Sequence, residues 1–208
     1  MKGLILEGIP GSGKTSVLRE LKKKTADMDA SWLLLNEQIT ERPLEPLKSA
    51  DLRKSIAHLN RLTNLLSGMQ EITNGNEKHK AAEFRFILER FHFSHCLDIA
   101  GVEKFESYVE VDRRLNELRS KIVVLRLDDA HILDRCVNST KQHRPLAWAK
   151  YLDRIADTDQ GIADHYRKQQ EQFIGLCRKT SIPSMVVDAS SGDWEDLSFQ
   201  ILEFIERS

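Results

Sequence analysis

A glycine-rich stretch near the start of the chain has the residue types that a phosphate-binding site needs. Residues 8–15, Gly-Ile-Pro-Gly-Ser-Gly-Lys-Thr, fit the pattern G-x-x-x-x-G-K-[ST]. Glycines let backbone N–H groups approach phosphate oxygens without a clash at Cβ, and the N-terminus of a following helix adds partial positive charge. We expect Lys14 to reach nucleotide phosphates and the Thr15 hydroxyl to bind Mg²⁺. The residues expected to contact the phosphates are Gly8, Pro10, Gly11, Ser12, Gly13, Lys14, Thr15 and Ser16.

The sequence on either side of this loop favours the same interpretation. Residues 4–6 form an apolar run that is typical of a buried parallel strand. After the loop, Val17, Leu18 and Leu21 give a helical apolar face, and residues 22–24 are lysines that suit the C-terminal end of a helix. A glycine-rich turn with a chance lysine is the alternative, and the order strand, loop, helix argues against it.

A second candidate site, Glu89-Arg90, follows a predicted strand at residues 84–89. A carboxylate at a strand end can hold Mg²⁺ directly or through water. The neighbouring guanidinium can bind a phosphate through two parallel hydrogen bonds. The alternative is a surface ion pair at a helix start, with Glu89 as the cap. The phosphate loop upstream favours the functional interpretation.

Strands and helices alternate along the chain, which predicts an α/β fold with a mainly parallel sheet and helices on both faces. Phosphates bind beyond the carboxyl ends of such strands, so Glu37, which follows the second strand, is a third candidate. The predicted strands are residues 4–6, 31–36, 84–89, 122–127 and 185–188. Further helices are predicted at 51–72, 92–105, 109–119, 130–137, 146–178 (with a break near Gly161) and 194–205, and residues 40–49 and 138–145 are expected to form loops, the second polar and mobile.

The composition is that of an ordinary globular protein. The chain has 208 residues, 40% of them hydrophobic and 30% charged, with a formal net charge of −1. Such a balance gives no field that would attract nucleic acid or an acidic membrane. No apolar run approaches membrane-spanning length, and the N-terminus leads directly into a strand, so we expect neither a membrane span nor a secretory signal.

The cysteines and histidines suggest neither a disulfide framework nor a metal cluster. Cys96, Cys136 and Cys177 are widely spaced, which predicts free thiols in a reducing cytosol and a cytoplasmic location. His92, His95 and Cys96 lie close together, but no second cluster completes a tetrahedral set.

Residues 6–15 resemble the opening of thymidylate kinases and related nucleoside and nucleotide kinases. The stretch Glu89-Arg90-Phe91-x-x-Ser94 resembles their second motif, and residues 162–166 and 187–189 stand where thymidylate kinases place similar residues. The resemblance covers nearly the whole chain in the order of elements. It implies a single domain with a three-layer P-loop NTPase fold, a five-stranded mainly parallel sheet and a lid at about residues 138–148. It also implies ATP and Mg²⁺ as cofactors and allows a homodimer.

The same resemblance implies a role for each matching residue. Lys14 and Thr15 would hold the donor phosphates and Mg²⁺, Glu89 would serve the metal, and Arg90 would bind the acceptor. Glu37 matches the acidic residue that nucleoside kinases use as a base toward the 5′-hydroxyl. Lys141 and Arg144 match the lid cations that embrace the donor, with Arg135 just before them. For Glu37 the alternative is a plain loop carboxylate, and for the lid cations it is solvated charge.

Some positions depart from the thymidylate kinase pattern. Pro10 stands where those enzymes usually have Asp, and the sequence 36–38, Asn-Glu-Gln, replaces their Arg-Glu-Pro. Residues 68–70 contain no arginine that could recognise a thymine ring, although Gln70 could hydrogen-bond a base from the helix that carries it. The resemblance therefore indicates the superfamily and leaves the acceptor open.

The leading hypothesis is ATP-dependent phosphoryl transfer to a small acceptor, a nucleoside or a nucleoside monophosphate. The alternatives are a kinase for another small alcohol, such as a sugar, an antibiotic or a metabolite, and a non-catalytic ATP-binding regulator of kinase fold. Asp98-x-x-Gly101 matches the D-x-x-G of GTPases, but it lies in a predicted helix, and no Asn-Lys-x-Asp follows. A GTPase is therefore disfavoured.

Overall fold

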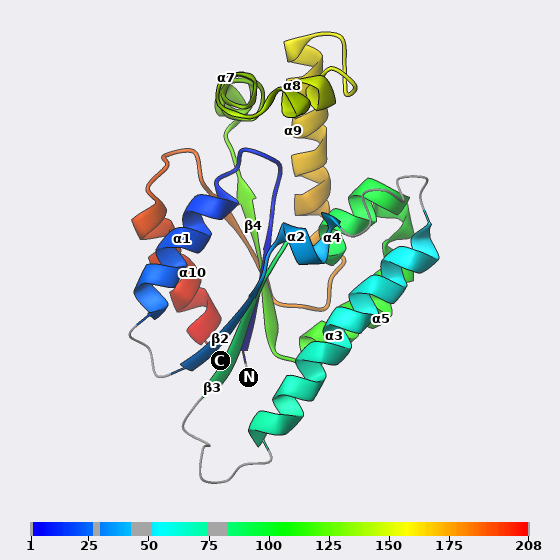
Figure 1. The fold of residues 1–208 in the computed structure, drawn as a ribbon, viewed down its shortest axis with the longest axis vertical. Coiled ribbons are helices and arrows are strands. Elements are labelled where there is room, and N and C mark those ends of the chain that lie inside the picture. Colours follow the sequence, from blue (N-terminus) through cyan, green and yellow to red (C-terminus); the bar gives the residue numbers. More distant parts are fainter. Residues whose placement is uncertain (1, 27–29, 43–50, 75–82, 208) are drawn as a thin grey trace.

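The computed structural model describes residues 2–26, 30–42, 51–74 and 83–207, and its centre is one parallel sheet of five strands (Figure 1). The strand order is β2-β3-β1-β4-β5. The strands are β1 (Lys2–Glu7), β2 (Ala30–Leu35), β3 (Glu83–Glu89), β4 (Ser120–Arg126) and β5 (Ser184–Asp188). The α/β fold with a parallel five-stranded sheet that the sequence predicts is confirmed.

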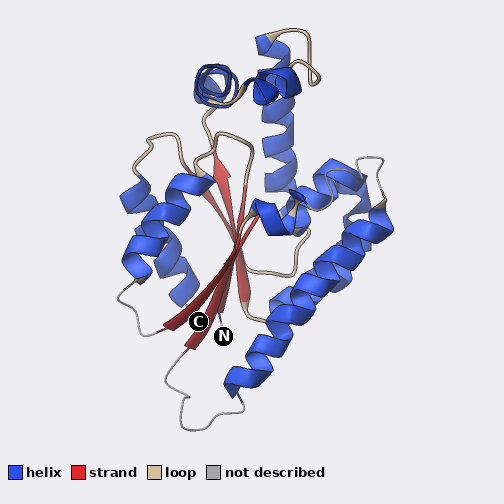
Figure 2. Ribbon diagram, viewed as in Figure 1, coloured by secondary structure: helices blue, strands red, loops and turns tan. Residues whose placement is uncertain are grey.

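Helices cover both faces of the sheet, as Figure 2 shows. On one face lie α1 (Lys14–Thr25) and α10 (Trp194–Glu206), and on the other lie α3 (Leu52–Asn74), α5 (Val109–Glu117) and α9 (Asp159–Leu176). Because both faces are covered, the central strand is apolar on both sides, and Leu4, Ile5 and Leu6 are each at most 1% exposed.

The register brings the ends of the central strands to one edge of the sheet. Leu6 pairs with Glu89, Glu7 pairs with Val124, and Leu35 pairs with Leu88. The segments that follow β1, β2 and β3 therefore start side by side. These segments contain the glycine loop, Glu37 and Arg90, so the three candidate sites lie at the same edge.

Short helices complete the carboxyl edge of the sheet. They are α2 (Glu37–Thr40), α4 (His92–His95), the π-helical turn η3 (Cys96–Ala100), the 3-10 helix η4 (Val102–Tyr108), α6 (Asp129–Ile132), the π-helical turn η5 (Leu133–Asn138), α7 (Ser139–His143) and α8 (Leu146–Leu152). Figure 1 places α7 and α8 beyond the end of β4, over the glycine loop. None of the helices in the described part of the chain is long and apolar enough to cross a membrane.

Three predicted segments differ from the structure. Residues 138–145 are not a loop throughout, because α7 occupies Ser139–His143. The only buried side chain of α7 is Thr140, so the segment has no apolar periodicity that would predict a helix. The predicted helix at 92–105 breaks at Gly101, which has a φ of 82°. The break in the predicted helix at 146–178 lies at 153–158, where Thr158 caps α9 by accepting a hydrogen bond from the Gly161 N–H. Part of the predicted loop at 40–49 lies outside the described residues.

A buried carboxylate joins the end of the central strand to the second motif. Glu7 is fully buried, and its Oε1 accepts hydrogen bonds from the Phe91 N–H (2.9 Å) and the Ser94 N–H (3.3 Å). Its Oε2 accepts a hydrogen bond from the Ser94 hydroxyl at 2.6 Å. Glu7 thus caps α4 from the neighbouring strand and fixes the glycine loop relative to Glu89-Arg90.

Replacing Glu7 with Ala is expected to lower the free energy of unfolding by about 3 kcal/mol, because the two N–H groups and the hydroxyl lose their buried acceptor. Urea denaturation followed by circular dichroism measures the change. Glu117→Ala on α5 removes an exposed carboxylate and is the control, with an expected change within about 0.5 kcal/mol. Equal small changes in both variants would contradict the assigned role of Glu7.

Candidate active site

The glycine loop between β1 and α1 needs glycine at two closely packed points. Gly11 has a φ of 83°, and a Cβ there would lie 2.7 Å from the carbonyl oxygen of Arg135 in η5. Gly13 caps α1 with a φ of 97°, and a Cβ there would lie 2.4 Å from the ring of Trp194 in α10. Both positions combine left-handed backbone with a close neighbour, so the loop is held in one shape by the elements around it.

Lys14, the first residue of α1, lies buried over this loop. Its Nζ donates hydrogen bonds to the carbonyl oxygens of Gly8 (2.8 Å) and Ile9 (2.9 Å). Burial, with the charge of Arg90 acting in the same direction, lowers the pKa of Lys14 to about 8. The buried Ser12 Oγ has no hydrogen-bond partner among the described residues. The loop therefore holds a cation and a free hydroxyl, both suited to an oxyanion.

A cavity of about 550 Å³, called the loop cavity below, opens in front of the glycine loop. Ten of the residues expected from the sequence line it: Pro10, Gly11, Gly13, Lys14, Thr15, Ser16, Glu37, Glu89, Arg90 and Arg144. Gly8, Ser12 and Lys141 are not among the lining residues. The parallel sheet thus brings nearly all the candidate residues around one space.

The two carboxylates of the loop cavity come from separate strands. Glu89 ends β3, and burial raises the pKa of its carboxyl although Lys14 opposes the shift. Glu37 begins α2, which Asn36 caps by accepting a hydrogen bond from the Gln38 N–H. The two segments are tied together because the Thr40 hydroxyl donates a hydrogen bond to the carbonyl oxygen of Glu89 at 2.6 Å.

Cations from three segments face this cavity. The Arg144 guanidinium, just after α7, lies 4.7 Å from the centre of the Trp148 ring, and Arg42 lies 5.7 Å from the same ring. Arg42 also forms an ion pair with Glu37 at 2.9 Å. Arg135 lies over the Trp194 ring and donates a hydrogen bond to the Ala189 carbonyl. Sequence reasoning did not single out Arg42, which has no motif around it.

Lys141 is placed differently from the other lid cation. It lies in α7, where its Nζ donates a hydrogen bond to Asp159 at 2.5 Å and approaches Asp153 to 3.9 Å. These contacts join the lid segment to the start of α9. In this arrangement Lys141 links α7 to the start of α9 and stays outside the loop cavity.

Arg90 is held by two carboxylates from different segments. Its Nε and one terminal nitrogen donate hydrogen bonds to the two carboxylate oxygens of Glu41, the second at 3.0 Å, and the same nitrogen reaches Asp98 at 3.3 Å. The arginine backbone has a φ of 53°, a left-handed conformation that is uncommon for residues other than glycine. Burial raises the pKa of Glu41, but the opposing charge and hydrogen bonds of Arg90 leave it lowered overall.

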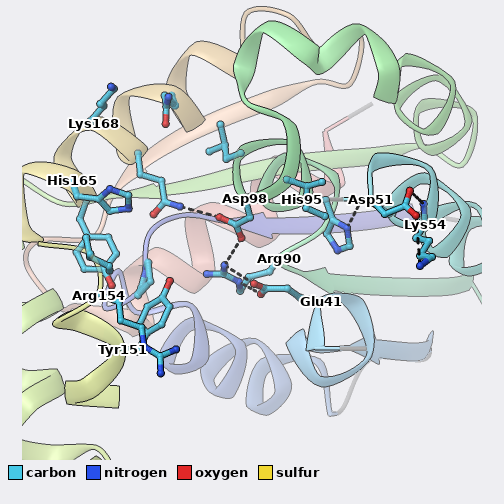
Figure 3. A pocket seen from close by; sticks show the side chains of 18 residues that line it. Glu41, Asp51, Lys54, Arg90, His95, Asp98, Tyr151, Arg154, His165 and Lys168 are labelled. Atoms are coloured by element: carbon cyan, nitrogen blue, oxygen red, sulfur yellow. Dashed lines mark hydrogen bonds and ion pairs between the residues drawn. The ribbon is translucent and has the colours of Figure 1, made fainter. Parts of the chain in front are cut away.

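A second cavity, of about 610 Å³, adjoins the loop cavity (Figure 3). The two cavities share Pro10, Glu41, Arg90 and Tyr151 among their lining residues. Apolar and amide side chains form much of the remaining wall: Leu97, Ile99, Ile155, Tyr166, Gln169 and Gln172. Gln70 lines neither cavity. The amide side chains that line the second cavity are Gln169 and Gln172 on α9, and sequence reasoning did not identify either as a site residue.

The histidines of α4 belong to buried hydrogen-bond networks. His92 pairs with Asp112 at 3.1 Å. His95 Nε2 donates to the Thr40 carbonyl at 2.7 Å, and His95 Nδ1 accepts from the Ser55 hydroxyl at 2.9 Å. Among the described residues, no group of three or more His, Cys, Asp or Glu side chains could hold a metal ion by itself. Any bound cation would need ligands beyond such side chains.

Comparisons with known proteins place the fold. No protein-family model matches the sequence, and no curated protein matches it significantly. The structure is similar to that of the YorR protein from Bacillus subtilis in complex with phosphorylated GDP, with a TM-score of 0.60 and 15% identity, over 98% of this chain and 95% of that chain. It is also similar to deoxyadenosine kinase from M. mycoides with the products dCMP and a flexible dCDP, with a TM-score of 0.50 and 15% identity, over 99% of this chain and 100% of that chain. At such identities the likeness shows a shared fold, so the fold implied by the kinase resemblance is confirmed.

The buried state of His95 predicts a pH dependence of stability. Burial lowers its pKa from 6.5 to about 4. Between these values the unfolded chain binds a proton that the folded chain does not, so stability falls as the pH drops from about 6.5 to about 4, by at most about 3 kcal/mol. Urea titrations across this pH range give the free energy of unfolding at each pH. The slope of this free energy against pH should be smaller for His95→Gln than for the wild type. His131→Gln, at an exposed site on α6, is the control, and equal slopes in all three proteins would contradict the prediction.

Proposed function

We propose that this protein is a P-loop kinase that transfers the γ-phosphoryl group of ATP to a small acceptor, a nucleoside or a nucleoside monophosphate. One observation carries the proposal: a cavity built on the glycine loop adjoins a second cavity whose lining includes apolar and amide side chains, and the two meet at Arg90. Such an arrangement holds a phosphate donor and an organic acceptor end to end. The nucleotides bound to the two similar structures support this proposal.

The donor phosphates would lie in the loop cavity. Lys14 would exchange its hydrogen bonds to the loop carbonyls for bonds to phosphate oxygens, with the N–H groups of the loop around them. Arg144 and Arg135 face the same space and would balance the charge of the outer phosphates. Lys141 would support the lid through α9.

The residues present fit a magnesium ion. The exposed Thr15 hydroxyl and the Glu89 carboxylate both line the loop cavity and offer the hard oxygen ligands that Mg²⁺ prefers, with phosphate oxygens and water completing the set. The unpartnered Ser12 hydroxyl leaves a further polar group available to the bound nucleotide. When bound, Mg²⁺ would neutralise charge on the transferring phosphoryl group.

The chemical step would depend mainly on placement. An acceptor oxygen forms a bond to the γ-phosphorus, the bond from that phosphorus to the oxygen bridging it to the β-phosphorus breaks, and ADP leaves. If the acceptor is a hydroxyl, its proton passes to a carboxylate, and Glu37 at the start of α2 is the residue proposed for this role. Lys14 would stabilise the negative charge that develops.

Lys14→Ala is expected to lower kcat/KM by at least about 100-fold, because the variant loses the cation that contacts the donor phosphates. ADP release from Mg-ATP, measured with a panel of nucleosides, nucleoside monophosphates and simple alcohols, tests this. Lys23→Ala, on the same helix at an exposed position paired with Glu20, is the matched control with unchanged activity. If the wild type binds ATP but releases no ADP with any acceptor, a non-catalytic regulator is favoured. If it phosphorylates only a sugar or another simple alcohol, the alternative of a kinase for another small alcohol is favoured.

Glu37→Gln is expected to lower kcat by about 100-fold or more for a hydroxyl acceptor while the Kd for ATP stays within about twofold. The amide cannot take the proton, but its size preserves the loop cavity. Steady-state kinetics and an ATP titration separate the two effects. Glu20→Gln on α1 serves as a charge-matched control away from the cavity. Near-full activity of Glu37→Gln would remove Glu37 from the role of base.

A further inference from the structure

We infer that the acceptor of this protein is an uncharged alcohol of the nucleoside type, and that Glu41 and Asp98 exclude acceptors that already carry a phosphate. The inference rests on the proposed function and narrows its acceptor. It follows from the way in which these two carboxylates occupy Arg90, the residue at which the two cavities meet (Figure 3).

Arg90 already has the partners that a phosphate would otherwise provide. Glu41 binds the guanidinium through both carboxylate oxygens, the same two-pronged geometry with which a guanidinium binds a phosphate. Asp98 accepts a further hydrogen bond from the same side chain. The Arg90 side chain is only 11% exposed, so little of it faces free solvent. An acceptor phosphate could reach Arg90 only by displacing a carboxylate.

The segments that carry the two carboxylates are tied to neighbouring elements of the fold. Glu41 follows α2, whose Thr40 carbonyl accepts hydrogen bonds from His95 and from His58 on α3. Asp98 accepts a hydrogen bond from Gln169 on α9 at 3.3 Å. Displacement of Asp98 would therefore break a contact with α9, and the backbone that precedes Glu41 is fixed by the two histidines.

The formal charge at the junction is negative. Arg90 contributes one positive charge, and Glu41 and Asp98 contribute two negative charges. A phosphorylated acceptor would bring about 1.5 to 2 further negative charges at neutral pH. A neutral hydroxyl would meet no such repulsion and could donate a hydrogen bond to either carboxylate.

The other charged side chains of the second cavity lie toward its two ends (Figure 3). Asp51 and Lys54, at the far end of the view in Figure 3, approach each other to 3.6 Å. Arg154 and Lys168, on the side of α8 and α9, are exposed to solvent, which screens their charges as it does the charge of the exposed Asp98. The apolar and amide walls between these ends suit a planar ring with hydrogen-bonding edges.

The test compares each nucleoside with its own 5′-monophosphate as acceptor for Mg-ATP, using adenosine, guanosine, deoxycytidine and thymidine with the purified full-length protein. At least one nucleoside is expected to be phosphorylated with a kcat/KM about 100-fold or more above that of its monophosphate. A monophosphate that is accepted within about tenfold of its nucleoside, or better, overturns the inference and leaves the proposed kinase function intact.

A pair of variants tests the carboxylates themselves. Glu41→Gln combined with Asp98→Asn should free the guanidinium and tighten the binding of that nucleoside's monophosphate about tenfold, measured by calorimetry. Asp98→Asn alone, at the more exposed position, should give a smaller change in the same direction. The matched control is Glu110→Gln with Glu117→Gln, which removes two exposed carboxylates from Arg113 on α5. Unchanged monophosphate binding in a folded double variant overturns the inference.

Failure of the proposed function would look different. If no compound releases ADP, the kinase proposal fails, and the binding measurements then decide the inference alone. Tighter binding of a nucleoside than of its monophosphate by the wild type would support the selectivity of the second cavity. Tighter binding of the monophosphate would overturn it.

Discussion

The carboxylate of Glu7 lies fully buried at the end of the central strand and accepts hydrogen bonds from the backbone of Phe91 and Ser94. Glu7 directly precedes the glycine loop, and Phe91 directly follows Arg90, so one side chain sets the distance between the two segments proposed to bind the donor and the acceptor. A donor site and an acceptor site need a fixed separation for phosphoryl transfer. Here that separation is determined by the packing of β1 against α4 and not by the loops themselves.

Several charged groups around the two cavities have partners within the protein. Lys14 lies against loop carbonyls, Glu37 pairs with Arg42, and Arg90 pairs with Glu41 and Asp98. Buried charges are costly without such partners. A ligand therefore exchanges one set of partners for another. We therefore expect the site to favour ligands whose charged groups have the same sign as the protein groups that they displace.

Much of the fold and part of the site could be predicted because the signals are local. The loop pattern and the apolar run before it identify β1, the loop and α1, and parallel strands then bring Glu37 and Glu89 to the same edge. The partners of Arg90 could not be predicted, since Glu41 lies 49 residues away in sequence. The amides of the second cavity come from α9. Their spacing is that of ordinary solvent-facing residues on a helix, so the sequence gives no sign that they line a site.

The motif around Arg90 specifies an arginine but not what that arginine binds. Its backbone is fixed, because the Arg90 N–H donates to the Leu6 carbonyl and Glu7 caps the helix that follows. The backbone of Arg90 is therefore fixed at the junction of the cavities, while the partners of its guanidinium can vary. A chain that places small neutral residues at positions 41 and 98 would present a free guanidinium to a phosphate. This chain places carboxylates there, so the guanidinium is already hydrogen-bonded on the side where a phosphate would bind, which is why we infer an alcohol as the acceptor.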